Sequence, residues 1–136
     1  MVKKVIQQMI NNGIEIKNST VGLMGITFKE NCPDFRNSKI IDVYSELKNW
    51  GASVVVIDPW VDQAKLQKEY QIKLGKIDNE NKVDSLIVAV GHDQFRSLSP
   101  VELKSYCNGS KPVIGDVKSI YNREELIKEG FSVFRL

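Results

Sequence analysis

Five short apolar runs that alternate with longer amphipathic stretches most constrain what this chain can fold into. Most of the runs are rich in β-branched residues, and they lie at 20–25, 53–58, 85–90, 111–116 and 131–136. Because the runs are continuously apolar, without polar residues at every second position, they indicate strands that are covered on both faces. Such strands are typical of parallel sheets.

The stretches between these runs have the spacing of amphipathic helices. In 38–50 the apolar residues recur every three or four positions, and Gly51 follows where a glycine commonly ends a helix. In the last stretch we expect Asn122 to cap the start of a helix and Gly130 to end it. The complete set of predicted helices is 2–10, 38–50, 61–70, 99–107 and 122–130.

Alternating strands and helices predict right-handed strand–helix–strand crossovers and an open sheet. We therefore predict an α/β fold: a Rossmann-like, doubly wound, mostly parallel sheet of about five to six strands with helices on both faces. The 136 residues match the usual length of one domain.

Composition and charge exclude several classes of function. The net charge is +2, and the 19 basic residues are dispersed among 17 acidic ones, which argues against binding to nucleic acid. No apolar run approaches the roughly 18 residues of a membrane span. The N-terminal residues lack the apolar core and cleavage site of a secretory signal, so we expect a cytoplasmic protein.

The residues that commonly bind metals are sparse. Cys32 and Cys107 show neither a metal-binding spacing nor a C-x-x-C motif, and we expect them to be reduced thiols. The single histidine, His92, cannot make a metal site by itself. The sequence therefore predicts no metal centre.

Ligands of open parallel sheets bind beyond the carboxyl ends of the strands, beside the point where the strand order reverses. The candidate binding residues are those that directly follow the predicted strands, at 28–36, 58–60, 91–93 and 116–118.

A dinucleotide site at these strand ends would use Gly22 and Gly25 for the phosphates and Asp58 for the ribose. The two glycines do not form the pattern G-x-G-x-x-G, and Asp58 lies well beyond the roughly 20-residue spacing expected of the ribose acid. We interpret the glycines as small residues of a crowded strand and Asp58 as an acidic strand end.

The long loop after the first strand has the side chains of an anion site. Lys29 and Arg36 are two cations that can converge on a phosphate, and Phe28 offers a flat apolar surface for a base. The start of the next helix adds free N–H groups. Lys118, after the fourth strand, would reach the same edge of the sheet. The alternative interpretation is a solvated loop with incidental charges.

Asn37 or Ser38 is expected to cap the helix that follows this loop.

Several motifs of the chain together resemble the C-terminal domain of the UDP-glucose/GDP-mannose dehydrogenase family. That family's pattern is G-x-x-F-K, then D-x-R-x-S, then a strand that ends in D-P. In this sequence the matching residues are Gly25, Phe28, Lys29, Asp34, Arg36, Ser38, Asp58 and Pro59. Segments 86–95 and 113–121 extend the resemblance over nearly the whole chain. The segment "TFKENCPDFRNS" (27–38) most resembles the corresponding segment in the branch of the family that acts on UDP-N-acetylhexosamines, the Vi-antigen type.

The resemblance implies one domain of a larger enzyme. The family's enzymes oxidise the C6 alcohol of a nucleotide sugar to a carboxylate in two NAD-dependent steps. An N-terminal domain binds NAD, a central helical domain forms a homodimer, and the C-terminal domain binds the UDP-sugar. We therefore expect residues 1–18 to be the end of a linking helix and residues 19–136 to be the UDP-sugar-binding domain. The expected reaction converts a UDP-N-acetylhexosamine to its uronic acid for surface polysaccharide synthesis.

The resemblance also assigns roles to individual residues. Phe28 and Lys29 match positions that contact the UDP-sugar, and Lys118 lies in a segment that contributes a basic residue to the substrate. Arg36 matches an arginine that reaches from the substrate domain towards NAD.

No residue of this chain matches the family's catalytic cysteine, which belongs to the preceding domains. Neither Cys32 nor Cys107 is its counterpart, so the chain alone is expected to be inactive in hydride transfer. The alternative is a stand-alone, non-catalytic nucleotide-binding or scaffold domain, which an upstream in-frame Rossmann domain in the gene would exclude.

Two further residues have competing interpretations. His92 follows a strand, as a general base would, but no serine or cysteine nucleophile motif accompanies it, which favours a hydrogen-bonded structural histidine. Trp60 would stack on a base or pack against a neighbouring domain, and we favour the domain contact.

Overall fold

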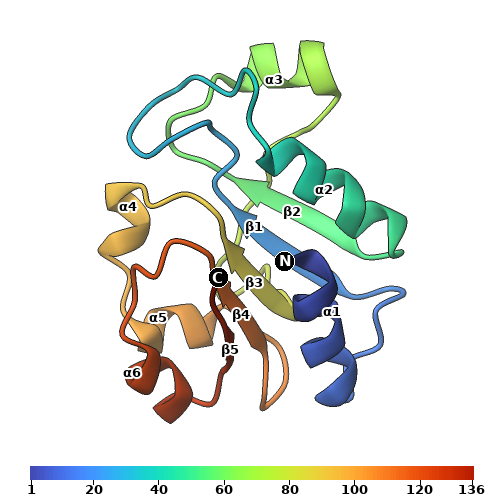
Figure 1. The fold of residues 1–136 in the computed structure, drawn as a ribbon, viewed down its shortest axis with the longest axis vertical. Coiled ribbons are helices and arrows are strands. Elements are labelled where there is room, and N and C mark those ends of the chain that lie inside the picture. The colour runs from blue at the N-terminus through green and yellow to red at the C-terminus, as the bar shows by residue number, and fades with distance from the viewer.

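Five parallel strands form the centre of the structure, a computed structural model that describes residues 1–136 (Figure 1). The strands are β1 (Thr20–Met24), β2 (Ser53–Ile57), β3 (Ser85–Val88), β4 (Val113–Asp116) and β5 (Ser132–Phe134). Their order in the sheet is β2-β1-β3-β4-β5, and every adjacent pair is parallel. The predicted strands and the predicted parallel sheet are confirmed.

Six helices connect or precede the strands. They are α1 (Val2–Asn11), α2 (Ile40–Asn49), α3 (Gln63–Tyr70), α4 (Asp93–Arg96), α5 (Pro100–Ser105) and α6 (Arg123–Lys128). Five of them correspond to predicted helices, with ends that differ by one to a few residues. Helix α4 was not predicted, because a helix of four residues is too short to show a hydrophobic period.

The residues at the helix ends explain where the helices begin and stop. The Asn122 side chain accepts a hydrogen bond from the Glu125 N–H at 3.0 Å, which confirms the predicted cap of α6. Gly51 and Gly130 have φ values of +93° and +102°, a conformation that favours glycine and ends α2 and α6. The predicted cap of α2 is wrong: the N-cap residue is Lys39, which makes no side-chain cap, and neither Asn37 nor Ser38 occupies that position. Ser38, one residue earlier, accepts a hydrogen bond from the Ile40 N–H at 3.2 Å.

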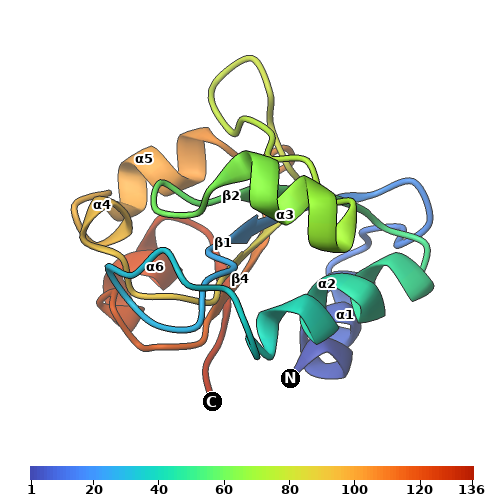
Figure 2. The same ribbon diagram turned by 90° about the horizontal axis from the view of Figure 1, so that it is seen from above.

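Alternate side chains of the strands enter two hydrophobic cores, one on each face of the sheet. Leu23 and Ile87 belong to the core that contains residues of α1, α2 and α3. Leu86 and Val88 belong to the core that contains residues of α4, α5 and α6. Figures 1 and 2 show α1 and α2 on one side of the sheet and α4 to α6 on the other. This two-sided burial confirms the doubly wound α/β fold with helices on both faces, and it explains why the strands lack polar alternation.

Helix α1 packs into the same core as the sheet. Its residues Val2, Val5, Ile6 and Met9 are all buried, and the helix contacts β4 and β5. It is therefore an integral part of this folded unit; its assignment to a linking helix stays a prediction. No helix in the structure has the length and apolar character needed to cross a membrane.

The order of the strands in the sheet reverses between β1 and β3. The chain leaves β1 for its neighbour β2 on one side, then crosses back to β3 on the other side of β1. The connections that leave β1 and β3 at their carboxyl ends therefore diverge from a common edge, which is where open α/β sheets bind ligands.

Gly25 is the residue that lets the chain leave β1 at this edge. Its φ is +97°, and a Cβ atom there would lie 2.6 Å from Cβ of Val90, beside β3. Gly13, after α1, has a similar φ of +79° but no atom within 4 Å of its Cβ position. The two glycines thus share a left-handed backbone conformation, which would strain any other residue, and they differ in crowding.

We expect Gly25→Ala to lower the free energy of unfolding by roughly 2–4 kcal/mol, through left-handed strain and overpacking together. Gly13→Ala is the matched control and should cost only the strain, about 1–2 kcal/mol. Urea denaturation of both variants measures the difference. Equal losses would show that contact with Val90 does not constrain this position.

Candidate functional site

A hollow of about 480 Å³ lies at the reversal of the strand order. The β1–α2 loop, the end of β3 with its following residues, and the turn after β4 line it. Three of the four predicted site residues, Phe28, Lys29 and Lys118, line this one hollow, although they come from two distant parts of the sequence.

The hollow carries an excess of positive charge. Besides Lys29 and Lys118, its lining includes Lys39 and Arg96, against a single acidic residue, Glu30. Lys39 and Arg96 were not among the predicted site residues. Lys39 directly follows the D-x-R-x-S motif and so had a sequence signal. Arg96 had none, because it depends on the unpredicted helix α4, which turns its side chain back to the strand end.

Glu30 and Arg96 form an ion pair across the edge of the hollow. Their Oε2 and Nη2 atoms are 3.1 Å apart, and Nε of Arg96 donates to the Gly91 carbonyl at 3.0 Å. A Cβ at position 91 would lie 2.8 Å from Nη2 of Arg96 and 3.2 Å from Oε2 of Glu30. The absence of a side chain at Gly91 therefore leaves room for the pair directly above the end of β3.

The turn after β4 presents Lys118 to the hollow. Asp116, fully buried at the end of β4, accepts hydrogen bonds from the N–H groups of Ile120 and Tyr121, both at 3.0 Å. These bonds fix a tight turn in which Ser119 has a φ of +53°. Lys118 is held at the top of that turn.

Arg36 does not line this hollow and lies on the outer side of the loop. Its Nε and Nη2 atoms each lie 3.0 Å from one oxygen of the Asp34 carboxylate. These hydrogen bonds hold the pKa of Asp34 below its usual value. The Arg36 side chain is 78% exposed, and it shares a smaller surface hollow with Phe28. The structure therefore does not bring Arg36 together with the two lysines, and its predicted role towards NAD stays a prediction.

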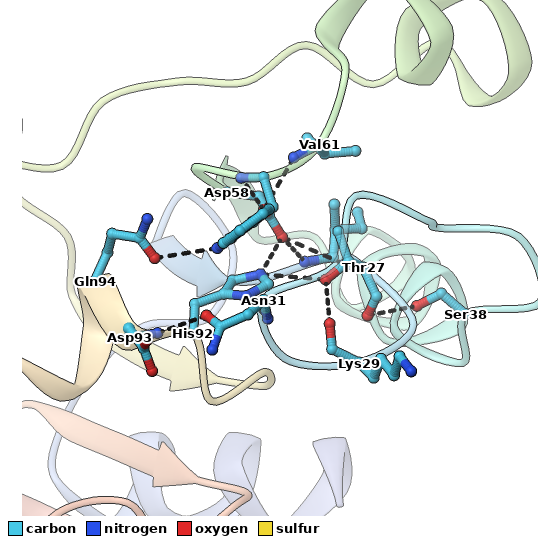
Figure 3. Close-up of polar contacts among 11 residues, drawn as sticks. Thr27, Lys29, Asn31, Ser38, Asp58, Val61, His92, Asp93 and Gln94 are labelled. Carbon is cyan, nitrogen blue, oxygen red and sulfur yellow. Dashed lines mark hydrogen bonds and ion pairs between the residues drawn. The ribbon is translucent and has the colours of Figure 1, made fainter.

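His92 is fully buried beneath the loop and is fully hydrogen-bonded, as the sequence indicated (Figure 3). Its Nδ1 accepts the Asn31 N–H at 2.9 Å, and its Nε2 lies 3.0 Å from Oδ2 of Asp58. Because Nδ1 accepts a hydrogen bond, the neutral ring carries its proton on Nε2 and donates to Asp58. The imidazole is thus enclosed and cannot touch a ligand in the hollow.

Asp58 is the acceptor at the centre of this edge. Its two oxygens accept four backbone N–H groups, those of Ile26, Thr27, Trp60 and Val61. Burial raises the pKa of Asp58, but the hydrogen bonds from His92 and from the backbone outweigh this effect and lower it. The carboxylate has no oxygen left for a ligand.

The residues of this edge do not fit a dinucleotide. The Asp58 carboxylate is occupied inside the protein, so it cannot bind a ribose. A Cβ at Gly22 would lie 2.6 Å from Ile77 and 3.0 Å from Leu86, so this glycine serves the packing of side chains and not the approach of a phosphate. The interpretation of Gly22 and Asp58 as structural residues is confirmed.

The two cysteines are free thiols in separate environments. Burial raises the pKa of the Cys107 thiol to about 12, so it stays protonated and unreactive at neutral pH. Cys32 is half-buried in the β1–α2 loop and does not line the hollow. No group of three histidine, cysteine or acidic side chains is arranged to hold a metal ion.

Comparison with known proteins identifies relatives of this chain. Residues 22–123 match the UDP binding domain of the UDP-glucose/GDP-mannose dehydrogenase family. A UDP-N-acetyl-D-glucosamine 6-dehydrogenase of Salmonella typhi is 38% identical over 123 residues, which cover 90% of this chain and 29% of that protein. Protein CapL of Staphylococcus aureus is 34% identical over 128 residues, 93% of this chain and 29% of its own length. The chain thus spans under a third of these relatives.

Solved structures confirm the fold. An NDP-N-acetyl-D-galactosaminuronic acid dehydrogenase from Methanosarcina mazei superposes with a TM-score of 0.86 at 23% identity, over 98% of this chain and 28% of that one. A UDP-D-ManNAc dehydrogenase from Pyrococcus horikoshii gives a TM-score of 0.77 at 16% identity, over 98% of this chain and 29% of that one.

The lowered pKa of Asp58 predicts a specific loss of stability in acid. A depressed folded pKa adds stability above the unfolded value, about pH 4, and this stability disappears as the pH falls through the folded pKa. The free energy of unfolding should therefore fall from about pH 5 downwards, and less steeply in Asp58→Asn. Denaturant titrations at several pH values measure both slopes.

The matched control is Glu80→Gln, in the exposed loop before β3, which should keep the wild-type slope. If Asp58→Asn also keeps that slope, the buried carboxylate does not account for the acid sensitivity.

Proposed function

The chain belongs to the UDP-glucose/GDP-mannose dehydrogenase family, and we propose that it forms the nucleotide-sugar half of the active site of an NAD-dependent 6-dehydrogenase. The substrate would be a UDP-N-acetylhexosamine, as the relative from Salmonella typhi, a UDP-N-acetyl-D-glucosamine 6-dehydrogenase, suggests. The whole enzyme would oxidise the sugar C6 alcohol to a carboxylate for surface polysaccharide synthesis, in the cytoplasm.

The observation that carries this proposal is the convergence of Lys29 and Lys118 on one hollow. A pyrophosphate carries at least two negative charges and needs cations that approach it from different sides. The two lysines come from the ends of β1 and β4, and Lys39 and Arg96 add two more cations at the same hollow. Phe28, which is 61% exposed at the rim, offers the apolar face on which a uracil or sugar ring can pack.

This chain supplies binding and not the redox chemistry. NAD would accept the hydride from the sugar, and a separate N-terminal domain would hold it, since no residue of the strand edge fits a dinucleotide. We propose that Arg36, on the outer side of the loop, reaches towards that cofactor, and that a central domain makes the whole enzyme a homodimer. The catalytic thiol would also lie outside residues 1–136, because Cys107 is buried and unreactive and Cys32 does not line the hollow.

We expect the chain to bind UDP weakly and Lys29→Ala and Lys118→Ala each to weaken binding by roughly tenfold or more. The estimate is the loss of one charge-assisted hydrogen bond to a phosphate. Isothermal titration calorimetry with UDP up to millimolar concentration measures these affinities. Lys128→Ala, at the far end of α6, removes the same charge away from the hollow and should leave the affinity unchanged.

Two results would contradict this proposal: no heat of binding from a folded wild-type sample, or an equal loss of affinity in Lys128→Ala.

We expect Glu30→Gln to strengthen UDP binding by up to about fivefold. The substitution removes the only acidic side chain of the hollow and releases Arg96 from a pair that is worth at most about 1 kcal/mol at an exposed site. The gain should shrink as sodium chloride is added, because salt screens the charges. Glu124→Gln on α6 is the matched control. Weaker binding by Glu30→Gln would show that Glu30 contacts the ligand directly or orders the loop.

A further inference from the structure

The buried His92 contacts both ends of the loop segment that carries Phe28 and Lys29. We propose that His92 is a positioning residue for the nucleotide-sugar site: its imidazole holds residues 27–31 in the bend that presents Phe28 and Lys29 to the hollow. This inference rests on the proposed function, and it assigns to His92 neither contact with the substrate nor a step in the chemistry.

The first contact is at the far end of the bend, at Asn31. Its N–H donates to Nδ1 of His92 at 2.9 Å, and its side-chain Oδ1 accepts the Asp93 N–H at 3.0 Å. Asn31 has a φ of +53°, a left-handed conformation that asparagine adopts more readily than most residues other than glycine. His92, directly before α4, and Asp93, the first residue of α4, hold Asn31 in this conformation through these two hydrogen bonds.

The second contact is at the near end of the bend, at Thr27. Its hydroxyl lies 3.2 Å from Nε2 of His92 and donates to the Lys29 carbonyl at 3.1 Å. Figure 3 shows this chain of contacts running from the imidazole through Thr27 to the backbone of Lys29. The imidazole therefore fixes the main chain on both sides of the residues that line the hollow.

The imidazole is itself held in one orientation. Its Nε2 faces Asp58, whose oxygens are fixed by four backbone N–H groups, and the ring packs 5.4 Å from the Phe95 ring and 6.4 Å from the Trp60 ring, centroid to centroid. Because these contacts fix the ring, it can hold the loop in one position relative to the edge of the sheet. It joins the connections that leave β1, β2 and β3.

The two ring nitrogens of His92 make different contacts, and two substitutions test these contacts separately. His92→Asn places an amide oxygen near the Nδ1 position, so it can still accept the Asn31 N–H. It loses the contacts of Nε2 with Asp58 and with the Thr27 hydroxyl, but that hydroxyl can still donate to the Lys29 carbonyl. His92→Gln places an amide N–H near the Nε2 position, so it can still donate to Asp58 while it loses the contact with Asn31. If His92 positions the loop, the affinity for UDP follows the Asn31 contact.

The test measures UDP affinity by calorimetry, hydrogen exchange of the Asn31 amide by NMR, and unfolding by denaturant for the wild type and both variants. We expect His92→Gln to weaken UDP binding and to speed Asn31 exchange, each by roughly tenfold. We expect His92→Asn to keep both within about threefold of wild type, whatever its loss of stability. Leu103→Val, a buried substitution in α5 away from the loop, calibrates the effect of lost stability alone.

Equal affinities in the two His92 variants, or losses that merely follow stability as in Leu103→Val, would overturn the proposal. If the wild type binds no UDP, the proposed function fails, and the exchange of the Asn31 amide then decides the positioning role by itself. If neither variant folds, Thr27→Val replaces them: it removes the link to the Lys29 carbonyl and should weaken UDP binding severalfold, and unchanged binding would overturn the proposal.

Discussion

The carboxylate of Asp58 is the interaction on which the rest of this structure depends. It lies buried at the end of β2, where an unpaired charge would be strongly destabilising, and it is stabilised by four backbone N–H groups and the imidazole of His92. Two of those N–H groups belong to the chain as it leaves β1, and His92 follows β3. One buried charge therefore sets the relative positions of three connections at the edge of the sheet.

The hollow at the same edge has the opposite electrostatic character. Its cations stand at the surface, where water reaches them and where only Glu30 and Arg96 are paired with each other. The two kinds of charge therefore lie in different places. The negative charge that holds the loops is buried and fully hydrogen-bonded, whereas the positive charges stay accessible to a ligand. A dianionic phosphate group would offset most of the positive charge of the hollow without disturbing the buried network.

Much of this arrangement could be predicted from the sequence, because it follows from local patterns. Continuous apolar runs predicted the parallel strands, and Asn122 and Gly51 predicted helix ends. The resemblance to a family selected Phe28, Lys29 and Lys118, which the fold brings to one hollow. Arg96 and the contacts of His92 could not be predicted, since they depend on a four-residue helix and on a bend at Asn31 with positive φ. Neither the short helix nor the bend shows a hydrophobic period in the sequence. Both form only where the connections that follow three strands meet.

We propose that the cation-lined hollow at the reversal of the strand order binds a nucleoside diphosphate. The most direct measurement is a titration of the isotope-labelled chain with UDP, followed through the backbone amide resonances. We expect saturable shifts concentrated at residues 27–30, at Gly91 and around Lys118, three segments that meet only in the folded structure. Shifts that scatter over the surface, or that gather away from these three segments, would contradict the proposal.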